Sequence, residues 1–213
     1  ARIEMVGFVG NERKIARGTD TSIHVRADAT RPFPPPDLCS ILYETEDGER
    51  GRVNMSRDGE PRDGYQYYVF TGKPFKSVLN DIQFDVIGYD HRLRDQRLKA
   101  VPSPVVSAIR LVSEPPAYLG QTVREEQWNP GLQLPRGSSV KALVQSSKQL
   151  LSATTKDLDS GEVQDIKFAE PTKEWTLEFG KLMGRKAISI SLYDVDQIDS
   201  LEPLVLSIGA IED

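Results

Sequence analysis

A segment that occurs twice constrains this chain more than any other feature. Arg17-Gly18-Thr19 leads into an alternating, strand-like run, and Arg136-Gly137-Ser138 leads into another with the same pattern. A second matching pair follows in the same order, Tyr89-Asp90 in the first copy and Tyr193-Asp194 in the second. Two copies of about 100 residues predict two similar domains, each large enough to bury its own core.

The boundary between the copies is predicted at Pro102-Ser103-Pro104. Proline lacks a backbone donor and stiffens the chain, so it is poorly suited to a strand interior and well suited to a linker. We therefore expect one domain over residues 1–103 and a second over residues 104–213.

Both copies show the period-2 alternation of half-buried strands, and neither has a long run with helical period. Turn pairs such as Asp58-Gly59 and Ser160-Gly161 separate the runs. Strands are expected near 2–8, 20–28, 38–45, 50–56, 65–71, 81–89 and 95–101, and near 106–112, 138–145, 149–156, 161–168, 173–179, 186–193 and 203–209. Helix is expected only as single turns near Ser77–Asp81 and Lys181–Gly184. Seven short strands in each copy predict an all-β fold of two tandem immunoglobulin-like (Ig-like) β-sandwiches.

Charge is distributed unevenly between the copies. Residues 1–104 hold 16 Lys and Arg and 16 Asp and Glu, and residues 105–213 hold the remaining 11 and 16, so the net charge of −5 belongs to the second half. A nucleic-acid partner requires a basic face, so this balance argues against one. The spaced arginines of copy one are expected to cluster on one sheet as a salt-bridged face. These are Arg50, Arg52, Arg92, Arg94 and Arg97.

Catalytic chemistry finds little support. The sequence contains no nucleotide-binding, metalloprotease or hydrolase motif, and its two histidines, His24 and His91, cannot form a three-histidine metal site. The single cysteine, Cys39, lies in a strand-like run and is expected to be buried and inert. No apolar run approaches the ~20 residues of a membrane helix, so this segment is not expected to insert into a membrane. We expect no catalytic residues and no enzyme activity.

An acidic loop offers a candidate metal site. Asp194, Asp196 and Asp199 follow a predicted strand in the acidic copy. Carboxylate oxygens clustered on a loop suit Ca²⁺, although the run lacks the glycine of an EF-hand loop. The alternative is a solvated acidic loop. We expect no cofactor, with calcium as the alternative.

Aromatic residues in the long segment 113–135 offer a candidate ligand site. Trp128 and Tyr118 could project from it as rings on which a sugar stacks, whereas the alternative places Trp128 over an edge of the core. Trp175 alternates with Leu177 and Phe179, and this pattern predicts a core residue.

The chain resembles the tandem Ig-like domains of large, membrane-anchored bacterial envelope proteins of uncharacterised function. The resemblance is carried by the two Arg-Gly-[Thr/Ser] entries, by Phe84-Asp85-Val86-Ile87-Gly88-Tyr89-Asp90, and by Pro115-Pro116-Ala117-Tyr118-Leu119-Gly120. The chain departs from antibody domains because it lacks their cysteine pair. The resemblance implies an extracytoplasmic location, in the periplasm or at the cell surface, and supplies no catalytic residues.

These observations favour a non-catalytic spacer or protein-interaction module. Its partner would be another protein or other domains of the parent chain. Two alternatives remain open, namely a glycan- or calcium-dependent adhesion module and a fragment of an enzyme whose catalytic domain lies elsewhere in the parent chain.

Overall fold

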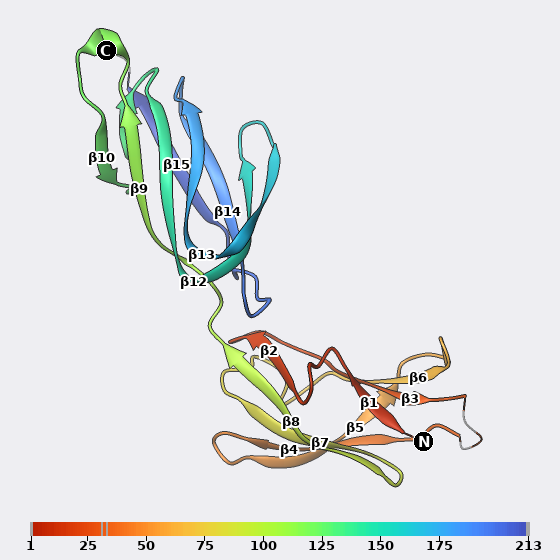
Figure 1. The fold of residues 1–213 in the computed structure, drawn as a ribbon. Coiled ribbons are helices and arrows are strands. Elements are labelled where there is room, and N and C mark those ends of the chain that lie inside the picture. The colour runs from red at the N-terminus through yellow and green to blue at the C-terminus, as the bar shows by residue number, and fades with distance from the viewer. Residues whose placement is uncertain (1, 31, 33, 212–213) are drawn as a thin grey trace. The chain divides into compact units, whose positions relative to one another are not determined.

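The computed structural model describes residues 2–30, 32 and 34–211, and within them the fold is all-β (Figure 1). The described part contains no α-helix, and its one helical turn is the 3-10 turn η1, Ala117–Leu119. The prediction of an all-β fold is confirmed. The helical turns expected near 77–81 and 181–184 were wrong, because both segments form bends and extended chain.

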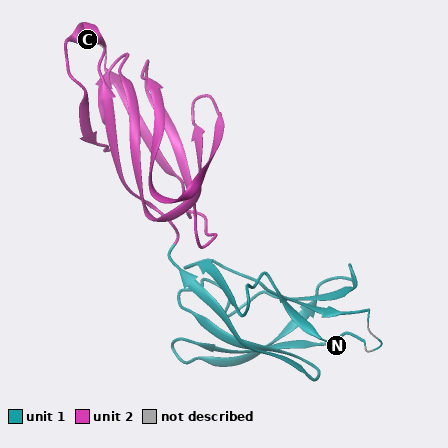
Figure 2. Cartoon of the chain, viewed as in Figure 1, with its two compact units in different colours: residues 1–102 teal, residues 103–213 magenta. Residues whose placement is uncertain are grey.

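The chain divides into two compact units, unit 1 (Ala1–Pro102) and unit 2 (Ser103–Asp213), shown in Figure 2. The strands of unit 1 are β1 Ile3–Val6, β2 Glu12–Ala16, β3 Ile23–Asp28, β4 Cys39–Thr45, β5 Arg50–Arg57, β6 Tyr65–Phe70, β7 Ile82–Gly88 and β8 His91–Val101. The strands of unit 2 are β9 Val106–Glu114, β10 Arg124–Gln127, β11 Gln133–Pro135, β12 Ser139–Asp157, β13 Val163–Lys181, β14 Lys186–Asp194 and β15 Leu204–Ile211.

Unit 1 is a sandwich of two sheets. One sheet has the order β1-β3-β6, and the other has the order β5-β4-β7-β8-β2. The two join where the end of β5 pairs with β6, at Ser56↔Val69 and Arg57↔Tyr68. All pairs are antiparallel except β2, which runs parallel to β8. This arrangement is that of an Ig-like sandwich.

Unit 2 repeats this arrangement with longer strands. The first half of β12 lies between β9 and β13, and its second half lies between β13 and β14. The register shifts between Gln145 and Leu150, so β12 passes from one sheet into the other at an irregularity and not at a turn. The segments 138–145 and 149–156, predicted as separate strands, are therefore one continuous strand. The same holds for 161–168 and 173–179 in β13.

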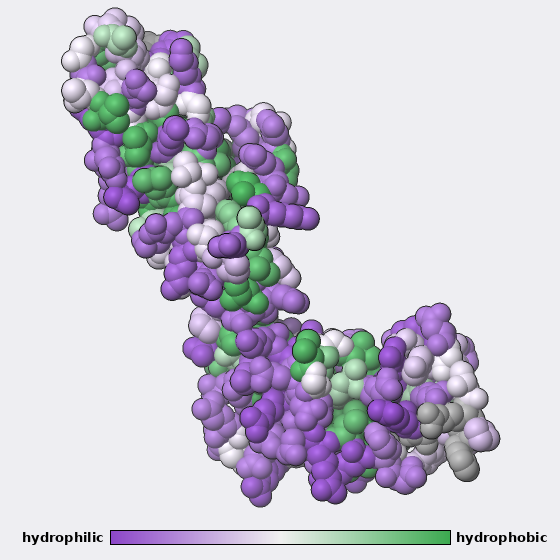
Figure 3. Space-filling view, in the orientation of Figure 1, coloured by the Kyte–Doolittle hydropathy of each residue, from purple (hydrophilic) through white to green (hydrophobic). Residues whose placement is uncertain are grey.

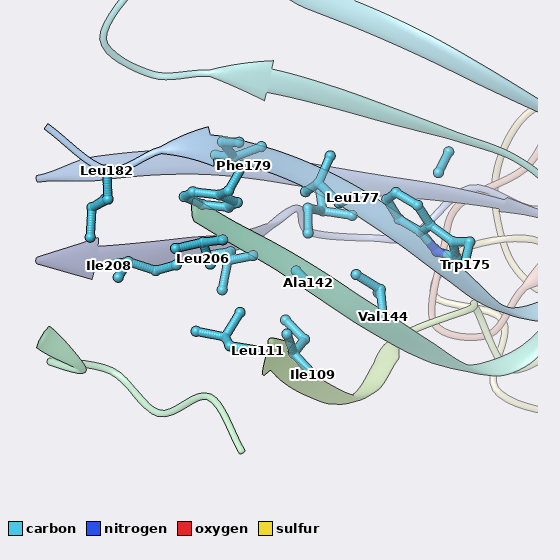
Figure 4. Packing of buried hydrophobic residues seen from close by; sticks show 14 of the residues in the cluster. Ile109, Leu111, Ala142, Val144, Trp175, Leu177, Phe179, Leu182, Leu206 and Ile208 are labelled. Carbon is cyan, nitrogen blue, oxygen red and sulfur yellow. The ribbon is translucent and has the colours of Figure 1, made fainter. Parts of the chain in front are cut away.

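Each unit has its own hydrophobic core, as the alternating residues predict. In unit 2, Figure 4 shows Ile109, Leu111, Val144, Leu177 and neighbouring side chains between the two sheets. Trp175 is 8% exposed in this core and lies against Phe168, with ring centroids 5.9 Å apart, so its predicted core position is confirmed. In unit 1, the ring of Phe75 packs edge-on against Phe84 at 5.6 Å.

Candidate interaction surface

The outer face of the β5-β4-β7-β8 sheet is the candidate functional site of unit 1. Strand alternation turns every second residue away from the core. The register aligns Arg50 with Glu44 and Glu44 with Gln83, and it aligns Gln83 with Arg97. Arginines therefore lie on the two outer strands of this face, β5 and β8, and shorter side chains lie on β4 and β7 between them. Figure 3 shows a mostly hydrophilic surface over β7 and β8.

This face is hollowed. One depression of about 610 Å³ is lined by Leu42, Tyr43, Glu44, Arg50, Gly51, Arg52, Gln83, Phe84, Asp85 and Asp95. A second, of about 520 Å³, is lined by Glu44, Thr45, Glu46, Asp81, Ile82, Gln83, Arg97 and Lys99. Because they share Glu44 and Gln83, the two form one trough across the sheet, which we call the arginine trough.

The clustering predicted for the five arginines is confirmed, but their pairing is incomplete. Arg50 pairs with Glu44 at 2.9 Å, and Arg92 pairs with Asp85 at 2.5 Å. Among the described residues, no carboxylate lies within ion-pair distance of the guanidinium groups of Arg52, Arg94 and Arg97. Arg52 donates instead to the Ser40 hydroxyl at 3.1 Å. All five arginines are exposed, so three guanidinium groups can donate hydrogen bonds to the carboxylates of a partner.

Gly51 and Tyr43 are among the residues that line the trough, and Tyr43 also packs against the unit 1 core. The register places them opposite each other on β5 and β4. A Cβ on Gly51 would collide with the phenol ring of Tyr43, so only glycine allows the ring this position. Burial, followed by the nearby Glu49 carboxylate, raises the pKa of Tyr43, and the Tyr43 hydroxyl donates to Glu49 at 3.3 Å.

The loop after β14 organises the predicted metal-binding residues around a lysine. The carboxylate of Asp194 is fully buried and accepts backbone N–H bonds from Asp196 at 2.9 Å and Ile198 at 3.0 Å. The ammonium group of Lys148 contacts Asp194 and lies 2.9 Å from the Asp196 carboxylate. Asp199 is exposed on the other side of the loop, where its backbone pairs with Tyr193.

The lysine therefore takes the position between two carboxylates that a cation would need. Among the residues that the structure describes, no group of three or more His, Cys, Asp or Glu side chains is arranged to hold a metal ion. Sequence reasoning missed Lys148, which lies about 46 positions earlier in the chain, at the bend of β12, and whose local sequence gives no sign of this contact.

The two predicted ligand-binding aromatics lie apart. Trp128 is half-buried against the unit 2 core and donates from Nε1 to the Ser207 carbonyl oxygen at 2.9 Å. Its own backbone N–H bonds to Ile109, whereas Tyr118 lies in the connection beyond Glu114 and is 73% exposed. Ile109 and Glu114 are five residues apart on β9, which is about 17 Å along the strand. Trp128 covers the core edge, whereas Tyr118 is exposed, and its role as a ligand-binding residue stays a prediction.

The remaining reactive groups of unit 1 have structural roles. Cys39 is fully buried, as expected, and burial raises its pKa to about 12. His91 accepts a hydrogen bond at Nδ1 from the Ile3 backbone N–H at 3.3 Å and so ties β8 to β1.

Within the described residues, no helix has the length and apolarity needed to cross a membrane.

Comparison with known proteins gives structural likeness alone. No family model and no curated protein matches the sequence. Among solved structures, a two-domain fibronectin type-III segment from chicken tenascin is similar, with 12% identity, 98% of each chain covered and a TM-score of 0.30. Tandem Ig repeats of Dlar show 8% identity and a TM-score of 0.27, covering 99% of this chain and 98% of that one. At such scores the likeness carries little weight, and the Ig-like assignment rests on the strand pairing described above.

Proposed function

We propose that this chain is a non-catalytic spacer and protein-interaction module, forming the extracytoplasmic part of a larger membrane-anchored protein. The sandwich supports such a role because it holds loops and sheet faces in fixed positions. The location outside the cytoplasm is supported by the resemblance to envelope proteins. Its partner is another protein or another domain of the parent chain.

The observation that carries the proposal is the arginine trough, in which the exposed guanidinium groups of Arg52 and Arg97 lack a carboxylate partner among the described residues. Arg52 and Arg97 lie on β5 and β8, three strand spacings apart, or about 14 Å, which is about four residues of an extended peptide. A segment that crosses the sheet with acidic side chains four residues apart can therefore meet both arginines. The trough favours a carboxylate-bearing protein segment.

A binding titration tests this proposal. The probe is a fluorescein-labelled octapeptide of alternating glutamate and serine, and the readout is fluorescence anisotropy at two salt concentrations. We expect weak binding that falls with salt and is lost in an Arg52→Gln/Arg97→Gln variant. The matched control is Arg124→Gln/Arg185→Gln, which removes the same charge from exposed positions in unit 2. Equal binding by both variants would reject the trough as the contact surface.

The location and the alternative function have separate tests. Protease accessibility of the chain in intact cells that express the parent protein, compared with lysed cells, tests the extracytoplasmic placement. A glycan- or calcium-dependent adhesion module is the second candidate, and a glycan panel run against the same chain tests it through Tyr118, which is 73% exposed.

A further inference from the structure

The outer face of the β12-β14-β15 sheet in unit 2 is almost free of charge. The outward positions of β14 and β15 are Ala187, Ser189, Ser191, Tyr193, Val205, Ser207, Gly209 and Ile211. None of them is Asp, Glu, Lys, Arg or His, in a chain with 28% charged residues. We call these eight positions, together with Ser152 and Thr154 of β12, the hydroxyl face. The corresponding sheet of unit 1 carries the arginine trough, so the two copies have diverged on the same face.

The strand register makes the hydroxyl face continuous. Ser152 lies opposite Tyr193, and Thr154 lies opposite Ser191. On the other side of β14, Ser189 lies opposite Val205 and Ala187 lies opposite Ser207. Short side chains in neighbouring rows leave a flat surface, with Tyr193 as the one large side chain near the end of β14.

Charged side chains lie beside these positions. Lys156 lies on the same side of β12, opposite Ser189, and Asp165 and Lys167 lie on the neighbouring strand β13. The Asp165 carboxylate already accepts a hydrogen bond from the Thr154 hydroxyl at 2.7 Å. The remainder of unit 2 carries the net charge of −5, so two copies that approach through most other surfaces repel each other.

We infer that the hydroxyl face is the docking surface for a second copy of this chain, face to face about a two-fold axis. Such an interface is self-complementary, because the same patch serves both partners. Hydroxyl groups meet this condition, since each both donates and accepts hydrogen bonds, whereas a patch of like charges cannot. The absence of carboxylates from the hydroxyl face removes the repulsion that the acidic unit creates elsewhere.

The size of the face sets the expected affinity. Three strands spaced about 4.8 Å apart, with a rise of about 3.3 Å per residue, give a patch of about 14 by 20 Å. A pair would bury roughly 600 Å² in total, which is below the range of stable specific interfaces and corresponds to a weak, reversible dimer.

Sedimentation equilibrium of the full chain from micromolar to millimolar concentration tests the inference. We expect a reversible monomer–dimer equilibrium. Ser191→Arg places a cation at the centre of the face and should weaken association at least tenfold, which is about 1.4 kcal/mol. The matched control is Thr176→Arg, an exposed threonine on the outer face of the opposite sheet, and it should leave the association constant unchanged.

A mixing experiment separates a docking defect from a folding defect. Ser191→Asp should also be monomeric, and an equimolar mixture with Ser191→Arg should associate again because opposite charges meet across the axis. Recovery in the mixture supports the inference. A wild-type chain that stays monomeric at millimolar concentration would overturn it, as would unchanged association of Ser191→Arg or equal loss in the Thr176→Arg control.

Discussion

Lys148 and Asp194 form a buried ion pair at one end of unit 2. The Asp194 side chain is fully buried, and the Lys148 side chain is 19% exposed. Burial lowers the pKa of Lys148, but hydrogen bonds to Asp194 and Asp196 outweigh it, so the pKa is raised overall. The bend of β12 and the loop that follows β14 are far apart in sequence. The ion pair holds these two segments together.

Removing the lysine should destabilise unit 2. In Lys148→Met the Asp194 carboxylate stays buried without its cation, which costs about 3 kcal/mol and lowers the melting temperature by about 10 °C or more. Both tryptophans, Trp128 and Trp175, lie in unit 2, so tryptophan emission during thermal unfolding reports on this unit alone. Lys141→Met is the control, because that lysine is 60% exposed in a surface pair and its loss should cost under about 0.5 kcal/mol. Equal losses in the two variants would show that Asp194 does not depend on Lys148.

Calcium should leave the stability of the wild-type chain unchanged. An ammonium group already neutralises Asp194 and Asp196, so Ca²⁺ would have to displace it from two carboxylates. The measurement is the melting temperature of chelator-treated protein in rising CaCl₂. Because a ligand that binds only the folded state stabilises it, an increase with calcium concentration would instead support a calcium site at this loop.

Cys39 should report on the unfolding of unit 1. Burial raises its pKa from 9.0 to about 12, so below pH 9 the thiol is protonated in both folded and unfolded chains. Between pH 9 and 12 only the unfolded chain loses the proton, so stability falls as pH rises through this window. We expect Ellman's reagent to react slowly at pH 8 and rapidly after addition of urea. In Cys39→Ala the urea midpoint should fall less steeply above pH 9 than in the wild-type chain. Equally steep declines in the two proteins would assign the effect to other groups. Tyr68 is one such group, because burial also raises its pKa to about 12.

Much of this fold follows from sequence because alternation and turn residues act locally. Three strands escaped prediction, namely β2, β10 and β11, which have three to five residues each, too few to show a period. Arg124–Gln127, for example, is entirely polar and forms a strand only because β9 offers it a paired edge. The bends of β12 and β13 escaped for the opposite reason, since a strand that changes sheets needs no turn residue.

The candidate surfaces could also be predicted from the sequence only in part. The clustering of the arginines follows from their spacing on predicted strands. Which of them lack carboxylate partners depends on cross-strand register, and the sequence does not contain that register in readable form. For Trp128, sequence left a core edge and a ligand platform open, and the bond to Ser207, 79 positions later, identifies the core edge.

Replacing Trp128 should therefore cost stability. Trp128→Ala removes a half-buried ring and its hydrogen bond to the Ser207 carbonyl, with an expected loss of about 2 kcal/mol in unit 2. Urea unfolding followed by the emission of Trp175 measures it. Tyr118→Ala removes a ring that is 73% exposed and should change the free energy of unfolding by under about 0.5 kcal/mol. A Trp128→Ala variant as stable as wild type would reopen the case for a ligand platform.

Gly51 should control the shape of the arginine trough independently of its charge. A Cβ in Gly51→Ala would meet the ring of Tyr43, which is partly exposed and can move, so the variant should stay folded. Both residues also line the trough, so a shift of either alters its shape, and binding of the acidic octapeptide should weaken although every arginine is retained. Gly184→Ala is the control, because a Cβ there meets nothing within 4 Å. One outcome would contradict this prediction, namely wild-type peptide binding by Gly51→Ala together with loss of binding in Arg52→Gln/Arg97→Gln. Peptide binding would then depend on the exposed charges and not on the shape of the trough.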